Sequence, residues 1–259
     1  AGGTKTIKEK ACYMIEELGK CQDAFEKIPG IRKGFLSGYP EDQFDKLEEY
    51  TPYPEIWAPY YTLHKIFAGL LDCYEFAGID QALEIAVKLG EWVYRRLSGL
   101  PREKRMKMWG MYIAGEYGGM NDVMARLYRI TGKKEFLETA GYFYNEKLFL
   151  PMEKGIDALE NLHANQHIPQ VIGAMEIFRA SGEKRYYDIA SYFWKAVTES
   201  HLYTIGGTGE NEMFHGPGCI GNLLTKHTAE SCASYNMLKL TKELYRYCLL
   251  YTSDAADEL

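Results

Sequence analysis

The feature that most constrains the fold of this chain is an internal repeat of about 50 residues. A glycine followed eight positions later by an alanine occurs three times, as Gly78 and Ala86, Gly132 and Ala140, and Gly182 and Ala190. Successive glycines are 54 and 50 residues apart. The glycine suits the position just after a helix, and the small alanine permits a close helix crossing. The repeat therefore predicts helical hairpins stacked side by side.

Apolar spacing places one predicted helix on each side of every repeat glycine. The helices before the glycines are predicted at 64–76, 121–130 and 168–180, and those after them at 81–97, 134–148 and 184–200. The first helix of each pair is expected to be short and apolar on several sides. The second carries one apolar stripe, as Phe136, Ala140 and Phe143 show. This difference is expected of the inner and outer helices of an α/α toroid.

In such a toroid the loops that precede the inner helices open on one mouth. These loops hold most of the unusual polar and aromatic residues, in segments 57–64, 117–121, 163–167 and 212–232. The glycine-rich segment 204–218 is too rich in turn residues for a helix, and loops of this length are usually functional or disordered. The mouth is therefore the predicted functional site.

Composition excludes several classes of protein. The 259 residues are 46% hydrophobic, which is enough for one sizeable core. The net charge of -6 argues against nucleic acid as a partner. No apolar run approaches the roughly 20 residues of a membrane span, and no signal-peptide core is visible at the N-terminus. The compartment, cytoplasmic or periplasmic in a bacterium, stays open.

A candidate metal site lies at Glu230 and Cys232, which are a hard and a soft ligand two residues apart. The six cysteines form no CxxC pair, so reduced thiols or a sparse metal site fit better than a disulfide framework. Residues i and i+2 of a helix do not face each other, so both can hold one ion only in the turn that leads into the following helix. The alternative is a buried cysteine beside an exposed glutamate.

Several separate motifs resemble the β-L-arabinofuranosidases of glycoside hydrolase family 127 and the related family 146. They are Trp57-Ala-Pro-Tyr-Tyr-Thr-Leu-His64, Glu116-Tyr-Gly-Gly-Met-Asn121, Leu162-His-Ala-Asn165 and Glu230-Ser-Cys232 with the following Ser-Tyr-Asn-Met-Leu-Lys-Leu240. The resemblance spans about residues 30–247. It implies an all-α fold, an (α/α)6-barrel toroid, followed by β-sandwich modules. It also implies a retaining hydrolase with a zinc-bound cysteine nucleophile in place of the usual second carboxylate.

The same resemblance implies roles for the acidic and thiol residues. Glu230 and Cys232 correspond to the first two ligands of a Zn²⁺ ion. Glu212 corresponds to the general acid/base, a role that requires a pKa high enough to keep a proton for the leaving oxygen. Glu210 remains an alternative for that role, because the spacing to Glu230 differs from the family pattern. The implied substrates are arabinose-containing oligosaccharides or glycoprotein glycans of plant cell walls.

The resemblance also implies residues that bind the substrate. His64 and His167 correspond to contacts with sugar hydroxyls, although each could instead be a satisfied core histidine. Trp57 and Tyr61 are candidates for stacking on a sugar face or for core packing. Asn121 is either a ligand of the substrate or a helix N-cap.

Two family features are expected beyond the end of this sequence: the nucleophile and an adjacent third thiolate ligand. We therefore expect residues 1–247 to be part of the catalytic barrel, truncated and inactive alone. Residues 248–259 resemble the translation of a sequencing adapter. If so, Cys248 is not a natural residue and is not a metal ligand. His215, His227 and Cys219 could complete a different metal site.

Two rival functions stay open at this point. One is a sugar epimerase or isomerase on the same toroid, with His64 and His167 as its acid/base pair and no need for zinc. The other is a toroid that binds carbohydrate without catalysis.

Overall fold

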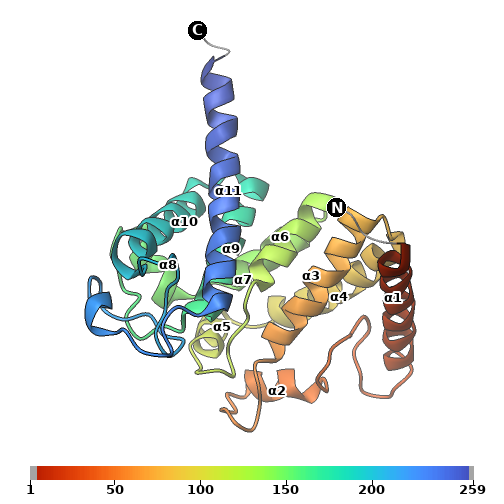
Figure 1. Ribbon diagram of the computed structural model, residues 1–259. Helices are drawn as coiled ribbons and strands as arrows, with labels where there is room; N and C mark the ends of the chain where they lie inside the picture. Colours follow the sequence, from red (N-terminus) through yellow and green to blue (C-terminus); the bar gives the residue numbers. More distant parts are fainter. Residues whose placement is uncertain (1–4, 257–259) are drawn as a thin grey trace. The chain divides into compact units, whose positions relative to one another are not determined.

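The computed structural model describes residues 5–256, with side chains as far as Tyr247, and its regular structure is helical (Figure 1). Between these limits the only β-structure consists of isolated bridges. The helices are α1 (Lys5–Phe25), α2 (Asp42–Glu48), α3 (Pro59–Ala77), α4 (Asp80–Ser98), α5 (Arg102–Trp109), α6 (Met120–Thr131), α7 (Lys134–Tyr142), α8 (Glu146–Glu153), α9 (Ala164–Ser181), α10 (Lys184–Ala196), the π-helix η1 (Val197–His201), the short η2 (Ile220–Asn222) and α11 (Ser231–Ala256).

The three predicted hairpins are confirmed as α3–α4, α6–α7 and α9–α10. Gly78, Gly132 and Gly182 cap the first helix of each pair with φ of 66°, 71° and 74°, the left-handed conformation that glycine adopts without strain. The repeat alanines at 86, 140 and 190 are completely buried, as a close helix crossing requires. In each repeat the glycine therefore marks the turn of the hairpin, and the alanine marks the close packing of its second helix.

Two predictions about the helices are wrong in detail. The first helices are not the shorter ones, since α6 has 12 residues against 9 in α7, and α9 has 18 against 13 in α10. The helix predicted at 134–148 is two helices, because Phe143 leaves the helical conformation at φ -86° and ψ 70°. Its ring is buried against Trp109, with ring centroids 5.1 Å apart. Burying this aromatic ring is worth more free energy than the hydrogen bonds that would continue the helix.

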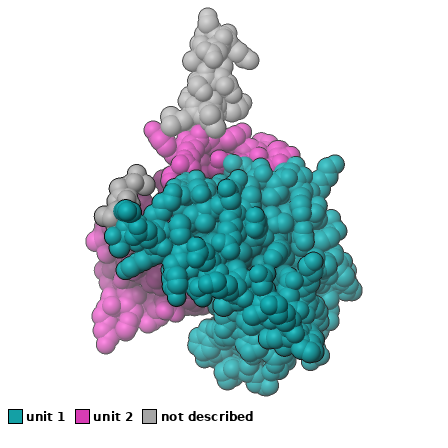
Figure 2. Space-filling view, turned by 90° about the vertical axis from the view of Figure 1, so that its right-hand side faces the viewer, with its two compact units in different colours: residues 1–143 teal, residues 144–259 magenta. Residues whose placement is uncertain are grey.

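The chain divides into two compact units, residues 1–143 and 144–259 (Figure 2). In the first unit α3 packs on α6, α4 packs on α7, and α1 packs on α4. Helix α4 and the α6–α7 hairpin approach closely, since a Cβ at Gly90 would lie 2.6 Å from Leu127 Cδ2. Buried aromatic rings fill the space between α2, α3 and α4, among them Phe44, Tyr60 and Trp92.

In the second unit α9 packs against both α10 and α11. All but five of its 18 residues are buried, whereas α10 buries one stripe that includes Tyr186, Ile189 and Phe193. This is the difference in burial expected between an inner and an outer helix. The amide of Asn236 on α11 donates to Asn165 on α9 at 2.7 Å. This bond joins the first turn of α9 to the second turn of α11.

Only part of the predicted tail at 248–259 is described. The backbone of residues 248–256 continues α11, and the side chains from Cys248 onward lie outside the described residues. Among the residues that the structure describes, no helix is both long enough and apolar enough to cross a membrane.

Candidate active site

Glu212 lies at the tip of a tight turn in the glycine-rich loop of the second unit. The backbone of Glu210 and Met213 forms two hydrogen bonds, with N···O distances of 3.0 and 3.1 Å. Asn211 and Glu212 between them have φ of 48° and 67°. Two positive φ values are the pattern of a type I′ turn, which asparagine tolerates and glutamate rarely adopts. Strain of this kind, of order 1 kcal/mol for such a residue, is found most often at functional sites.

Backbone hydrogen bonds fix this turn against the segments on both sides of it. Ala164 N donates to Glu212 O at 2.8 Å, and Phe214 N donates to Leu162 O at 2.9 Å, which ties the turn to the start of α9. Ala229 N donates to Gly209 O at 2.8 Å, which ties it to the approach to α11. Two of the predicted mouth segments, 163–167 and 212–232, therefore meet around Glu212.

The Glu212 carboxylate lies beside His163, a residue of the Leu162–Asn165 motif to which the sequence analysis assigned no role. Its Nε2 lies 3.3 Å from Glu212 Oε2. Its Nδ1 accepts the backbone N–H of Gln166 at 3.2 Å, which makes His163 the N-cap of α9. Because Nδ1 is an acceptor, the neutral ring carries its proton on Nε2, the nitrogen that lies 3.3 Å from Glu212 Oε2. The position of His163 just before a helix was the available signal for this role.

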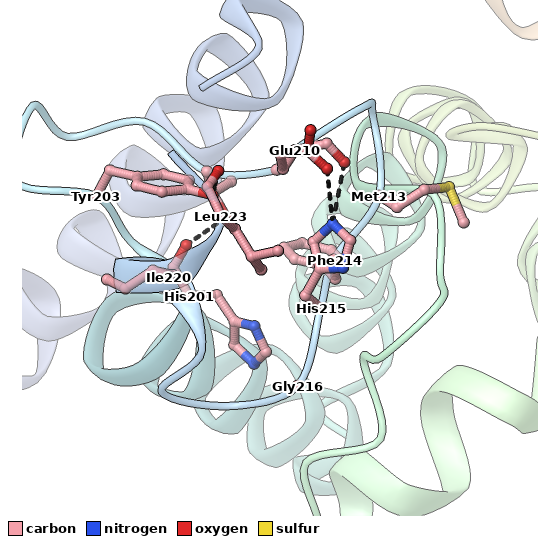
Figure 3. A pocket seen from close by; sticks show the side chains of 11 residues that line it. His201, Tyr203, Glu210, Met213, Phe214, His215, Gly216, Ile220 and Leu223 are labelled. Carbon is pink, nitrogen blue, oxygen red and sulfur yellow. Dashed lines mark hydrogen bonds and ion pairs between the residues drawn. The ribbon is translucent and has the colours of Figure 1, made fainter. Parts of the chain in front are cut away.

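The neighbouring Glu210 has a different environment (Figure 3). It is buried, Thr225 Oγ1 donates to its Oε1 at 2.9 Å, and His215 Nε2 lies 3.3 Å from its Oε2. The hydrogen bonds from Thr225 and Asn211 and the charge of His215 hold the pKa of Glu210 below its ordinary value. A carboxyl group held in its ionised form cannot deliver a proton efficiently near neutral pH. Its contacts brace the turn.

A small hollow lies behind the turn (Figure 3). Residues lining it include His201, Tyr203, Glu210, Phe214 and Leu223. Its volume is about 10 Å³, the space of one water molecule. His201 Nε2 lies 2.8 Å from Asp157 Oδ2 within this region. The hollow is too small to hold a sugar. The residues that line it pack under the loop and support it.

Glu230 and Cys232 lie where the loop enters α11. Helix α11 begins at Ser231, so Glu230 precedes the helix and Cys232 is in its first turn. This is the irregular entry that two adjacent ligands require. The Cys232 thiol is exposed, and a hydrogen bond with the Glu230 carboxylate raises its pKa. Glu230 is half-buried, and its Oε2 is a buried atom with no hydrogen-bond partner among the described residues. The alternative of a buried cysteine beside an exposed glutamate is therefore wrong.

His167 lies one turn into α9 and is buried. Its Nδ1 is 2.7 Å from the carbonyl oxygen of His163, four residues earlier. Burial lowers the pKa of His167 to about 4, so the ring is neutral at physiological pH. The contact fixes the ring, but a role for His167 in binding sugar stays a prediction.

In the first unit His64 lies under the loop that leads into α6. Gly119 N donates to His64 Nδ1 at 3.2 Å. A Cβ on Gly118 would lie 2.8 Å from His64 Nδ1 and 2.9 Å from the Tyr61 ring, and one on Gly119 would lie 2.8 Å from His64 Nε2. The two glycines are therefore needed for the loop to approach the imidazole this closely. With Nδ1 accepting, the neutral ring carries its proton on Nε2.

The remaining predicted substrate residues of this unit differ in exposure. Asn121 is fully buried at the second position of α6. Gly119 is the N-cap, so the alternative of Asn121 as N-cap is wrong. Trp57 is 53% exposed, and Tyr61 packs edge-to-face on His64 with ring centroids 6.2 Å apart. Trp57 is thus available to a ligand, whereas Tyr61 supports the imidazole.

Comparison with solved structures identifies the class of fold. Residues covering 92% of this chain superpose on 40% of a GH127 β-arabinofuranosidase with a TM-score of 0.62 and 19% identity. A GH127 β-L-arabinofuranosidase from Geobacillus stearothermophilus T6 matches 93% of this chain over 40% of its own length, with a TM-score of 0.65 and 16% identity. A third structure, described as a glycoside hydrolase, matches with a TM-score of 0.57, 13% identity and coverages of 92% and 42%. The chain shares the helical fold of these glycoside hydrolases over about 40% of their length, which agrees with the predicted truncated α/α toroid.

The family follows from the sequence match. The model of the GH127 catalytic domain, β-L-arabinofuranosidase, matches residues 1–256, and the chain belongs to this family. The resemblance to family 127 is thereby confirmed, while that to family 146 stays a prediction. Among curated proteins no relative matches the chain. The chain spans about 40% of the length of the solved structures that it matches.

Proposed function

We propose that the enzyme carrying this domain releases L-arabinose from β-L-arabinofuranosides of plant cell-wall glycans, with retention of configuration. Membership of the GH127 family supports a glycosidase. The observation that carries the assignment of the site is the strained turn that presents Glu212, an exposed carboxyl group, beside the capped imidazole of His163. Family membership favours hydrolysis over an epimerase or a toroid that only binds carbohydrate.

In this proposal Glu212 acts as general acid and then as general base. It protonates the glycosidic oxygen as the bond to the leaving group breaks, and it then takes a proton from the attacking water. His163 is a positioning residue, because its Nε2–H orients the carboxylate while its Nδ1 is held by the helix backbone. In the first unit, His64 is a separate candidate for contact with a sugar hydroxyl. We assign no residue of this chain to the nucleophile.

The residues at the entry to α11 fit a zinc ion. The carboxylate oxygen of Glu230 is buried without a partner, and the Cys232 sulfur lies beside the same carboxylate. Carboxylate and thiolate are both zinc ligands. Zinc, when bound, lowers the pKa of a coordinated thiol and so keeps a nucleophilic cysteine as thiolate. Glu230 and Cys232 would hold the ion at the base of the mouth segment that ends in α11.

Replacement of Glu212 tests the assignment of the acid. In the enzyme carrying this domain, Glu212→Gln should lower turnover of a substrate with a poor alkyl leaving group by about 10²–10⁴-fold. Turnover of an aryl β-L-arabinofuranoside should fall much less, because a good leaving group needs little protonation. The matched control is Glu210→Gln, two residues away in the same turn. If Glu210→Gln shows the dependence on leaving group and Glu212→Gln does not, the roles of the two residues are reversed.

A further inference from the structure

Three aromatic side chains form an exposed cluster at the surface of the first unit. Tyr112 is 76% exposed, Trp57 is 53% exposed and Tyr53 is 36% exposed. Tyr53 lies between the other two, with ring centroids 5.0 Å from Trp57 and 6.5 Å from Tyr112. Both contacts are edge-to-face, at interplanar angles of 74° and 88°. We call these three side chains the aromatic platform.

The platform is built from two loops that are far apart in sequence (Figure 1). Tyr53 and Trp57 lie in the loop between α2 and α3, and Tyr112 lies in the loop between α5 and α6. The backbone next to each of the two most exposed rings is in the left-handed region, with φ of 33° at Ala58 and 54° at Ile113. A β-branched residue with positive φ is a genuine outlier. Positive φ values at non-glycine residues are found most often at functional sites.

The same two loops also form the His64 site. The loop that carries Tyr112 continues to Gly119, whose N–H donates to His64 at 3.2 Å. The loop that carries Trp57 runs directly into α3, where Tyr61 and His64 lie within its first turns. The platform is therefore continuous with His64 and Tyr61, the candidate sugar-binding residues of the first unit.

We propose that the aromatic platform binds a neutral sugar of the glycan on which the enzyme acts. Sugar rings offer C–H faces that stack on aromatic rings, and the tyrosine hydroxyls and the indole N–H at the edges suit sugar hydroxyls. The net charge of -6 disfavours the stacking of nucleic acid bases on these rings. This inference rests on the proposed function, since it names a further contact for the same class of substrate.

Affinity electrophoresis of the 259-residue chain in gels containing soluble arabinan tests the platform. We expect arabinan to retard the unsubstituted chain, and we expect Tyr112→Ala and Trp57→Ala to bind roughly three- to tenfold more weakly. Tyr112→Phe keeps the ring and should bind nearly as well as the unsubstituted chain. Tyr13→Ala is the matched control, because Tyr13 is a comparably exposed tyrosine, 63% exposed, on α1 of the same unit.

Several outcomes would overturn the platform. They are no retardation of the unsubstituted chain, unchanged binding by Tyr112→Ala, or equal weakening by Tyr13→Ala. A change of oligomeric state on size-exclusion chromatography for Tyr112→Ala would show that the cluster is instead an interface between copies. Hydrolysis of an aryl β-L-arabinofuranoside by the enzyme carrying this domain tests the proposed function separately. If that hydrolysis fails while arabinan binding depends on Tyr112, the platform stands and the proposed function falls.

Discussion

Glu210 and Glu212 are two residues apart, yet the fold gives them opposite surroundings. Glu210 is buried among donors from Thr225, Asn211 and His215, whereas the Glu212 side chain is 64% exposed beside His163. The alternation follows from the turn, which directs neighbouring side chains to different sides of the loop. The sequence leaves both residues open as the general acid/base. Their different contacts favour Glu212, whose role stays a proposal.

The depressed pKa of Glu210 predicts a pH dependence of stability. A carboxyl group whose pKa is lower in the folded state stabilises that state at neutral pH, and the stabilisation is lost as pH falls through the folded pKa. Glu210→Gln should therefore lower the Tm at pH 7. The difference in Tm from the unsubstituted chain should shrink below about pH 4.3, the ordinary pKa of glutamate. Thermal melts between pH 7 and pH 3 measure this, and a constant difference would show that Glu210 acts through packing alone.

At the scale of the helical element, each hairpin turn depends on a glycine with open surroundings. A Cβ at Gly78, Gly132 or Gly182 would meet nothing within 4 Å. The requirement for glycine there is conformational and not steric. Gly90 is the opposite case, because a Cβ there would also lie 3.0 Å from the Phe136 ring. The repeat glycines and the packing glycine thus serve different purposes in the same fold.

Gly132→Val should lower the free energy of unfolding by roughly 1 kcal/mol or more, because valine is strained at φ of 71°. For a chain of this size the Tm should fall by about 2–4 °C. Gly132→Asn is the matched control, since asparagine tolerates the left-handed conformation. Differential scanning calorimetry compares the two. Equal Tm values for the valine variant and the unsubstituted chain would contradict the role of this turn.

At the scale of the whole molecule, the matched solved structures are longer than this chain, which covers about 40% of their length. The described residues contain no group of three or more His, Cys, Asp and Glu side chains placed to hold a metal. The pair Glu230 and Cys232 is the part of the proposed zinc site that the chain contributes. His215, which is bonded to Glu210, is committed to bracing the turn.

We expect the 259-residue chain to bind zinc weakly, because its described residues place no group of three or more His, Cys, Asp and Glu side chains together, and a tetrahedral site usually has four ligands. Metal analysis after dialysis should find substoichiometric zinc. Added Co²⁺ should give a thiolate charge-transfer band that Cys232→Ser abolishes and Cys219→Ser leaves unchanged. Tight stoichiometric zinc would contradict this expectation and would point to a different site that includes His227 or Cys219.

The sequence alone determined the hairpins and their turns. Both depend on short-range features: apolar spacing along one helix and a glycine at the position with positive φ. It also determined the motifs that resemble family 127, and with them the candidate residues from Trp57 to Cys232. The break at Phe143 was missed, because a single aromatic ring changes the path of the chain only when a distant pocket exists to bury it.

The tertiary structure decided which of these residues meet. It placed His163 against Glu212, exposed Cys232 while burying an oxygen of Glu230, and excluded Asn121 as an N-cap. It also brought Tyr112 to Tyr53, across 59 residues of sequence. No local pattern encodes such contacts, since they depend on the paths of loops that are held by backbone hydrogen bonds to other segments. Spacing along the chain therefore predicts which residues are candidates for the site. The packing of distant segments determines which side chains contact them.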